Sequence, residues 1–116
     1  MLKDAYCGQL RRTDEGRHVT LAGWVHRRRD HGGLIFIDLR DTSGIVQIVF
    51  DPNTPEAHAV AHRARVEWVL RIQGTVALRS PSTVNPNLPT GEIEIIPTHC
   101  EVLAEAQTPP FYINEP

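Results

Sequence analysis

Five segments of the chain alternate apolar and polar residues with the two-residue period of a β-strand. The first segment begins at Val19, the second is LIFIDLRD over 34–41, and the third covers 45–50. The fourth runs from about Trp68 to Arg79, and the fifth from Glu92 to Val102 or Leu103. An apolar residue at every second position buries one face of a sheet and leaves the other face for solvent or a ligand. The pattern predicts an all-β domain.

One segment of helical period lies between the third and fourth strands. Ala57, Val60, Ala61 and Ala64 recur at helical spacing, which predicts a single helix over about 55–66, capped by Asn53 or Thr54. We expect turns at 30–33 and 42–44, and a proline-rich loop at 80–91. This order predicts a five-stranded OB-fold Greek-key barrel with one helix between strands 3 and 4. Its binding face centres on strands 2 and 3 and is flanked by the 1–2 and 4–5 loops.

Composition excludes several other classes of protein. Apolar residues make up 41% of the chain and charged residues 22%, as in ordinary globular domains. The sequence has no apolar run of about 18 residues that could span a membrane, and no secretory signal at its N-terminus. Cys7 and Cys100 are too few for a disulfide framework and too far apart for a zinc motif. We therefore expect a reduced, cytoplasmic protein, with an OB-fold domain over 1–105 and a linker over 106–116.

Charge is unevenly distributed along the chain. The net charge is -2, yet arginines 27, 28, 29 and 40 and two histidines gather within 26–40. General nucleic-acid binders are normally basic throughout, so a basic patch on an acidic chain indicates a confined site for a polyanion. Three adjacent arginines on a strand cannot all face the same way, so at most two of them can face the ligand. The alternative is that these arginines are simply a solvated run of charges.

Three side chains on the outward parity of the predicted strands could contact an unpaired base. Phe36 could stack on a base, or could instead pack under a loop or against another domain. Gln47 could read a Watson–Crick edge, since its amide both donates and accepts, or could simply be solvated. Glu94 would be repelled by phosphates but could accept hydrogen bonds from guanine N1–H and N2–H; the alternative is one member of an acidic rim.

The sequence offers no catalytic or metal-binding pattern. His58 and His62 have a spacing that could hold a metal, but no third ligand accompanies them, so we expect solvated helix residues. Neither a nucleophile with a neighbouring base nor a glycine-rich phosphate loop is found. The chain alone is therefore not expected to be an enzyme, nor to bind a metal or cofactor.

The motifs resemble those of one known family. The runs GWVHRRRD at 23–30, LIFIDLRD at 34–41, GIVQ at 44–47, TGEIE at 90–94 and TPPF at 108–111 are similar to the N-terminal anticodon-binding domain of bacterial aspartyl-tRNA synthetases. The resemblance covers nearly the whole chain. The related asparaginyl and lysyl enzymes share the fold and part of the pattern.

The resemblance implies roles for individual residues. The GUC anticodon of tRNA(Asp) would lie unstacked on the barrel, with Phe36 stacked on the middle uracil and Gln47 and Arg29 at its edge. Glu94 would read the first base. Arg79 and the loop around Asn85 would lie near the third base, cytosine. Arg27 and Arg28 are expected at phosphates or bases, and His31 stands where a choice between tRNA(Asp) and tRNA(Asn) could be set, or is a polar turn residue.

The resemblance also implies what the full-length enzyme would do. Aspartate would be attached to tRNA in a class II catalytic domain beyond Pro116, using ATP and Mg²⁺, in a homodimer. This fragment would bind RNA as a monomer without charging it. Two other readings are a free-standing single-stranded nucleic-acid binder, which the aromatic content of 6% disfavours, and an OB-fold that binds a protein partner.

Overall fold

A computed structural model describes residues 3–105 of the chain. Its five strands form a closed barrel in the order β1-β2-β3-β5-β4. All pairs are antiparallel except β3 with β5, which closes the barrel at Ile48 and Ile95. The strands are β1 (His18–His31), β2 (Leu34–Asp41), β3 (Gly44–Phe50), β4 (Val69–Leu78) and β5 (Ile93–Ala104). The predicted all-β OB-fold is confirmed.

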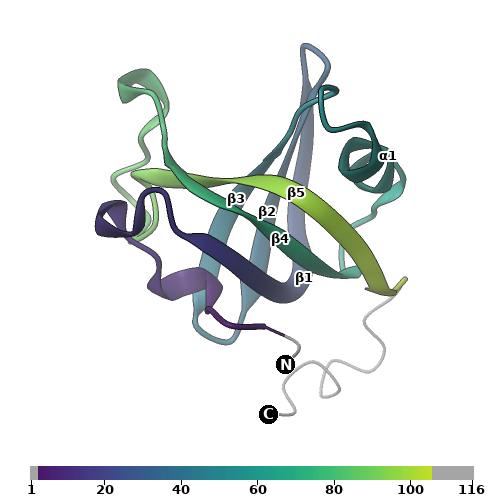
Figure 1. Ribbon diagram of the computed structural model, residues 1–116, viewed down its shortest axis with the longest axis horizontal. Coiled ribbons are helices and arrows are strands. Elements are labelled where there is room, and N and C mark those ends of the chain that lie inside the picture. Colours follow the sequence, from purple (N-terminus) through teal and green to yellow (C-terminus); the bar gives the residue numbers. More distant parts are fainter. Residues whose placement is uncertain (1–2, 106–116) are drawn as a thin grey trace.

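The single helix α1 (Pro55–Arg63) connects β3 to β4 and covers one side of the barrel (Figure 1). Ala57, Ala61 and Ala64 are buried and Val60 packs against the core, as the spacing predicts. The helix ends at Arg63 rather than at about Val66 as predicted, because Ala64 already has an extended backbone. Thr54 is the N-cap residue but caps through the backbone alone, with no side-chain hydrogen bond.

Strand β1 is longer than predicted because the turn after it is shorter. Asp30 and His31 pair with Ile35 and Leu34, so only Gly32 and Gly33 connect the strands. Both glycines have positive φ, 59° and 88°, which matches the two-residue turns preferred in β-hairpins. The turn predicted over 30–33 is confirmed in place but is confined to Gly32 and Gly33, since two glycines in sequence suffice to reverse the chain.

β1 also serves two neighbours in succession. It pairs with β4 up to Trp24 and with β2 from Trp24 onward. At the changeover, a Cβ on Gly23 would collide with the carbonyl oxygen of Arg40, so glycine permits the close approach that bends β1 between the two partners. Beyond Trp24 the end of β1 is therefore an edge strand that pairs with β2, while β2 also pairs with β3 as far as Ile35.

The N-terminal segment packs against the core of the barrel, which the strand pattern did not predict. Ala5, Cys7 and Leu10 are buried; Cys7 begins the short 3-10 helix η1 (Cys7–Gln9) and Leu10 follows it. A second 3-10 turn, η2, spans Arg12–Asp14. The Asp41 carboxylate accepts a hydrogen bond from the Cys7 backbone N–H at 2.8 Å. Burial acts to raise the pKa of Asp41, but the hydrogen bonds from Ser43 and Cys7 outweigh burial and lower it.

The core is aliphatic, with Phe50 as its largest fully buried side chain. Strand β3 is buried on both faces, because Gln47 and Val49 are covered as well as Val46 and Ile48. Among the described residues, no helix is long and apolar enough to cross a membrane. The predicted linker over 106–116 lies outside the described residues.

Candidate nucleic-acid interface

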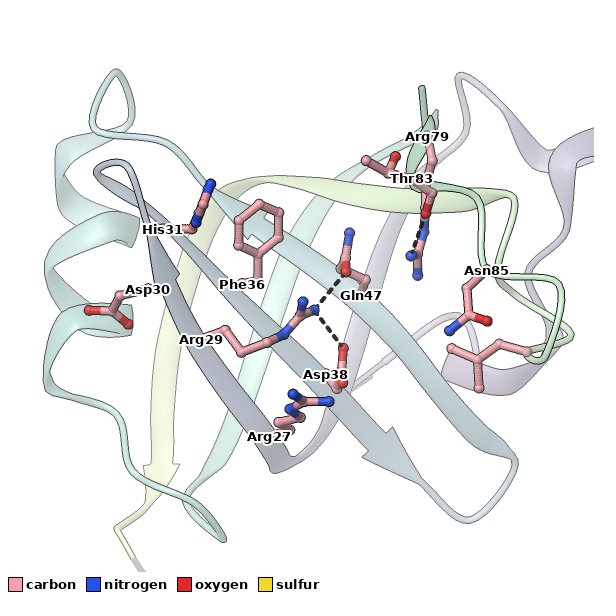
Figure 2. A pocket seen from close by; sticks show the side chains of 11 residues that line it. Arg27, Arg29, Asp30, His31, Phe36, Asp38, Gln47, Arg79, Thr83 and Asn85 are labelled. Carbon is pink, nitrogen blue, oxygen red and sulfur yellow. Dashed lines mark hydrogen bonds and ion pairs between the residues drawn. The ribbon is translucent and has the colours of Figure 1, made fainter. Parts of the chain in front are cut away.

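A groove of about 690 Å³ lies between the β1–β2 hairpin and the β4–β5 loop (Figure 2). This is the face that the OB-fold prediction assigned to ligand binding. Its lining combines basic, acidic, aromatic and amide side chains: Arg27, Arg29, Asp30, His31, Phe36, Asp38, Gln47, Arg79, Thr83, Asn85 and Leu88.

A β-bulge decides which arginines face this groove. The register of β1 on β2 shifts between Val25 and Arg27, so His26 has no partner. After the shift, Arg27 lies opposite Asp38 and Arg29 opposite Phe36. Directly opposed residues in an antiparallel pair project from the same face. Simple alternation from Val25 would have placed these arginines on the core side.

Phe36 and Arg29 form the aromatic part of the groove. The Arg29 guanidinium carbon lies 5.4 Å from the centre of the Phe36 ring, within the range of a cation–π contact. The ring is half-buried and its strand partner on β3 is Val49. Figure 2 shows the ring beside His31 at the hairpin end of the groove. The outward orientation predicted for Phe36 is confirmed.

A hydrogen-bonded series crosses the floor of the groove from β1 through β3 to β5. Arg29 Nη2 donates to Gln47 Oε1 at 3.0 Å, and Gln47 Nε2 donates to Glu94 Oε1 at 3.1 Å. Arg29 Nη2 also lies 4.0 Å from an Asp38 carboxylate oxygen. Gln47 is only 5% exposed, so its amide is bonded at both ends beneath the surface rather than being solvated. Its position orients one cationic and one anionic side chain.

The electrostatics of Glu94 follow from its half-buried position. Burial raises the pKa of its carboxyl group, while the hydrogen bond from Gln47 and the nearby Arg79 charge act to lower it. The net shift is upward. Burial likewise lowers the pKa of Arg79, against the attraction of Glu94 and Asp38. These groups share a site from which water is partly excluded, where each charge influences the others.

Arg79 and the β4–β5 loop form the far side of the groove. Arg79 Nε donates to the Ile93 carbonyl at 2.9 Å and Nη1 to the Thr83 carbonyl at 3.2 Å, which fixes its guanidinium beneath the loop. The loop contains one 3-10 turn, η3 (Pro81–Thr83). Asn85 lines the groove, and its side-chain oxygen accepts a bond from the Asn87 backbone N–H at 3.0 Å.

Arg28 is the predicted site residue that the fold directs elsewhere. It lies opposite Ile37, on the side of the hairpin that faces α1, and it does not line the groove. Glu94 does not line the cavity directly either, but its bond to Gln47 places it at the groove floor. The remaining predicted site residues, Arg27, Arg29, His31, Phe36, Gln47, Arg79 and Asn85, are brought together.

Several residues that line the groove were not predicted from the sequence. Asp38 shares strand parity with Phe36, so alternation alone could have identified it. Thr83 and Leu88 belong to an irregular loop, whose path no periodicity predicts. Asp30 lies at the edge of the groove, and its carboxylate is directed away from the groove and toward α1 (Figure 2).

Among residues 3–105, no cluster of histidine, cysteine or acidic side chains could hold a metal ion. His58 instead bonds through Nε2 to the Gly33 carbonyl at 2.9 Å. The groove offers a ring for stacking, donors from arginines and acceptors from Asp38 and Glu94. An unstacked base with one or two phosphates matches this mixture better than a dense array of phosphates does.

Solved structures with the same fold include parts of aminoacyl-tRNA synthetases. An asparaginyl-tRNA synthetase from Pyrococcus horikoshii, complexed with asparaginyl-adenylate, is 28% identical with a TM-score of 0.76, over 94% of this chain and 24% of its own. An aspartyl-tRNA synthetase from Entamoeba histolytica is 18% identical with a TM-score of 0.77, over 90% and 22%. The chain thus spans about a quarter of the length of these enzymes.

A protein binder has the fold as well. The OBody AM2EP06, solved bound to hen egg-white lysozyme, is 22% identical with a TM-score of 0.77, over 90% of this chain and 95% of its own.

A family model described as an OB-fold nucleic acid binding domain, named tRNA anti-codon, matches residues 19–103. The match contains every strand except the first residue of β1 and the last of β5, as well as the whole groove. The chain belongs to this family of OB-fold nucleic acid binding domains.

Proposed function

We propose that this chain is the anticodon-binding module of an aspartate–tRNA ligase and holds the GUC anticodon of tRNA(Asp). The observation that carries the proposal is the Arg29–Gln47–Glu94 series beside the Phe36 ring. It supplies a stacking surface, a fixed donor and a fixed acceptor within one groove, which are the elements of reading an unstacked base.

Each end of this series suits a different base. Phe36 would stack on the middle uracil, while Arg29, held in place by Gln47, would donate to its edge. Glu94 bonds to Gln47 through Oε1, and its Oε2 would accept from N1–H and N2–H of a guanine in the first position. Arg79 and Asn85, on the opposite wall, would lie near the third base.

The catalytic activity belongs, in this proposal, to a class II domain elsewhere in the parent enzyme. That domain would bind ATP and Mg²⁺ and attach aspartate to tRNA, in a cytoplasmic homodimer. The module described here would select tRNA, and as an isolated fragment would be monomeric. The anticodon GUU of tRNA(Asn) differs from GUC only in the third base, so the parent enzyme could accept both, and His31 would contribute to that choice.

Titration with labelled anticodon stem-loops tests the proposal. We expect the domain to bind a GUC loop with a dissociation constant of about 1 μM or weaker, corresponding to roughly -8 kcal/mol, and to bind a scrambled loop less tightly. Comparison of GUC and GUU loops with wild type and His31→Leu measures third-base selection. Equal affinity for poly-U or duplex DNA would exclude anticodon recognition and favour a general single-strand binder. No RNA binding would favour a protein-binding OB-fold.

A further inference from the structure

The β1–β2 hairpin carries one wall of the groove but extends beyond the barrel. Residues 28–31 of β1 pair only with β2, since the pairing with β4 ends at Trp24. β2 itself pairs with β3 as far as Ile35, so residues 28–31 form an edge strand with one free side. An edge strand is held by backbone pairing on one side only. Contacts on its other side therefore help to fix the position of Arg29.

Arg28 connects the hairpin to the C-terminal end of α1. Its Nη1 donates to the carbonyls of His62 and Ala64, both at 3.0 Å. Its Nε and Nη2 donate to the two oxygens of Asp30, at 3.0 and 2.9 Å. The guanidinium is thus bonded to two residues at the end of the helix and to Asp30, which lies two positions further along the same face of β1. Planar, multidentate bonding of this kind is specific to arginine.

Few other contacts join the hairpin to α1. His58 bonds to the Gly33 carbonyl at 2.9 Å, and a cavity of about 220 Å³ lies between the two elements, lined by residues 30–35 of the hairpin and by His58 and His62 of α1. The side chain of Arg28 is 18% exposed, so its bonds are partly shielded from water, while Asp30 is 56% exposed.

We propose that the Arg28–Asp30 pair positions the RNA-facing side of the hairpin by fixing its opposite side to α1. Strand alternation makes this coupling direct, because Arg28 and Asp30 interleave with Arg29 and His31 along β1. Arg28 is then a positioning residue rather than a phosphate contact. The inference rests on the proposed RNA-binding function of the groove.

Substitutions of Arg28 separate positioning from direct contact. Arg28→Ala and Arg28→Lys should both weaken binding of the GUC stem-loop by about tenfold, since lysine cannot form the forked bonds. The dependence of affinity on salt should stay as in wild type. Arg27→Ala, in contrast, should make the slope of log K against log salt shallower by about 0.7 if Arg27 contacts a phosphate. Retained binding in Arg28→Lys, or a shallower slope in Arg28→Ala, would overturn the proposal.

Arg65→Ala is the matched control. Arg65 Nη1 also donates to carbonyls at this helix end, those of Arg63 at 2.8 Å and Ala64 at 3.1 Å, but Arg65 has no bond to the hairpin. The stability of Arg65→Ala is compared directly with that of Arg28→Ala. Arg65→Ala should leave RNA affinity unchanged. An equal loss of affinity in both variants would assign the effect to the helix end and contradict positioning through the hairpin.

Amide hydrogen exchange tests the connection of the Arg28–Asp30 pair to α1 in the absence of RNA. Backbone amides of residues 29–36 should exchange faster in Arg28→Ala and Asp30→Ala than in wild type, and at the wild-type rate in Arg65→Ala. Unchanged exchange in all variants would overturn the proposal. If wild type binds GUC and scrambled loops alike, but amide exchange is still faster in Arg28→Ala and Asp30→Ala, the anticodon proposal fails. The positioning of the hairpin by the Arg28–Asp30 pair is then still supported.

Discussion

Phe36 and Ile37 are neighbours in sequence but lie in opposite environments. Ile37 is fully buried in the barrel core, while Phe36 is half-buried and faces the groove beside Arg29. A side chain that faces a groove contributes mainly to the affinity for the ligand it contacts, whereas a core side chain contributes mainly to the stability of the fold. The two adjacent positions on one strand therefore allow the groove-facing side and the core-facing side to be tested against each other.

Phe36→Ala should weaken GUC stem-loop binding by about 1–3 kcal/mol, the contribution of one stacked base. Its free energy of unfolding should change by about 1 kcal/mol or less. Ile37→Ala, the control, should lose about 2–5 kcal/mol of stability because it leaves a core cavity. Fluorescence titration and urea unfolding measure both quantities. A stability loss in Phe36→Ala as large as in Ile37→Ala would show that the ring acts as core.

Glu94→Gln should lose discrimination at the first anticodon base. The carboxylate offers only acceptors, as guanine N1–H and N2–H require, whereas the glutamine amide mixes a donor with an acceptor. Titration with guanine-first and adenine-first loops measures the change. A general phosphate-binding face gives the opposite result, since removal of a negative charge would tighten both loops by the same factor.

The same variant should also change how stability depends on pH. Because burial raises the pKa of Glu94, the folded state holds this proton to a higher pH than the unfolded chain does. This contribution to stability is present below the unfolded pKa and is lost as pH rises through the folded pKa. Glu94→Gln lacks the titration, so its stability relative to wild type should rise as the pH is raised from below to above the ordinary glutamate pKa of about 4.3. Urea unfolding across that range checks the sign; a constant difference contradicts it.

At the scale of elements, the β4–β5 loop is ordered by its own backbone. Asn85 N–H bonds to the Gly91 carbonyl and Gly91 N–H to the Leu88 carbonyl, each at 3.0 Å. Thr90, which is buried, anchors the loop to β3 through a 2.7 Å bond to the Ile45 carbonyl. The loop wall of the groove is thus preformed in the free protein rather than created by a ligand.

Gly91→Ala should displace this wall. A Cβ on Gly91 would collide with the Asn85 carbonyl oxygen, so the loop must shift. We expect RNA binding to weaken by about 1 kcal/mol or more, with the loss greatest for third-base discrimination. Gly16→Ala is the control: its φ of +87° strains an alanine, but its Cβ meets nothing within 4 Å and Gly16 does not line the groove. Equal affinity in Gly91→Ala and wild type would remove the loop from the binding site.

At the scale of the whole molecule, the charge balance restricts how RNA can bind. Arg27, Arg29 and Arg79 enter the groove together with the carboxylate of Asp38, on a chain of net charge -2. Neutralisation of Z phosphates on a single strand gives a slope of log K against log salt of about -0.7Z. With three groove arginines at most, the slope should be about -2 or shallower. A slope steeper than about -3 would require basic residues outside the groove.

The sequence by itself determined the five strands, the helix α1 and, outside the bulge in β1, the side of each that faces the core. Alternation over 34–41 and 45–50 places Ile37 and Ile48 in the core and Phe36 outside, because a strand has only two faces. The helix and the OB-fold order followed from a local change of period, and the separate motif resemblance indicated the anticodon-binding family. These properties are encoded by residues close in sequence, which is why they could be predicted.

Only the tertiary structure decided which polar side chains meet. The bulge at His26 reverses the alternation, so that Arg27 and Arg29 enter the groove and Arg28 turns to α1. Gln47 is buried between Arg29 and Glu94, partners on strands distant in sequence, and was expected to be accessible. A register shift depends on how two strands pair, and burial of an outward face depends on what the remaining chain places over it; neither is a local property of the sequence.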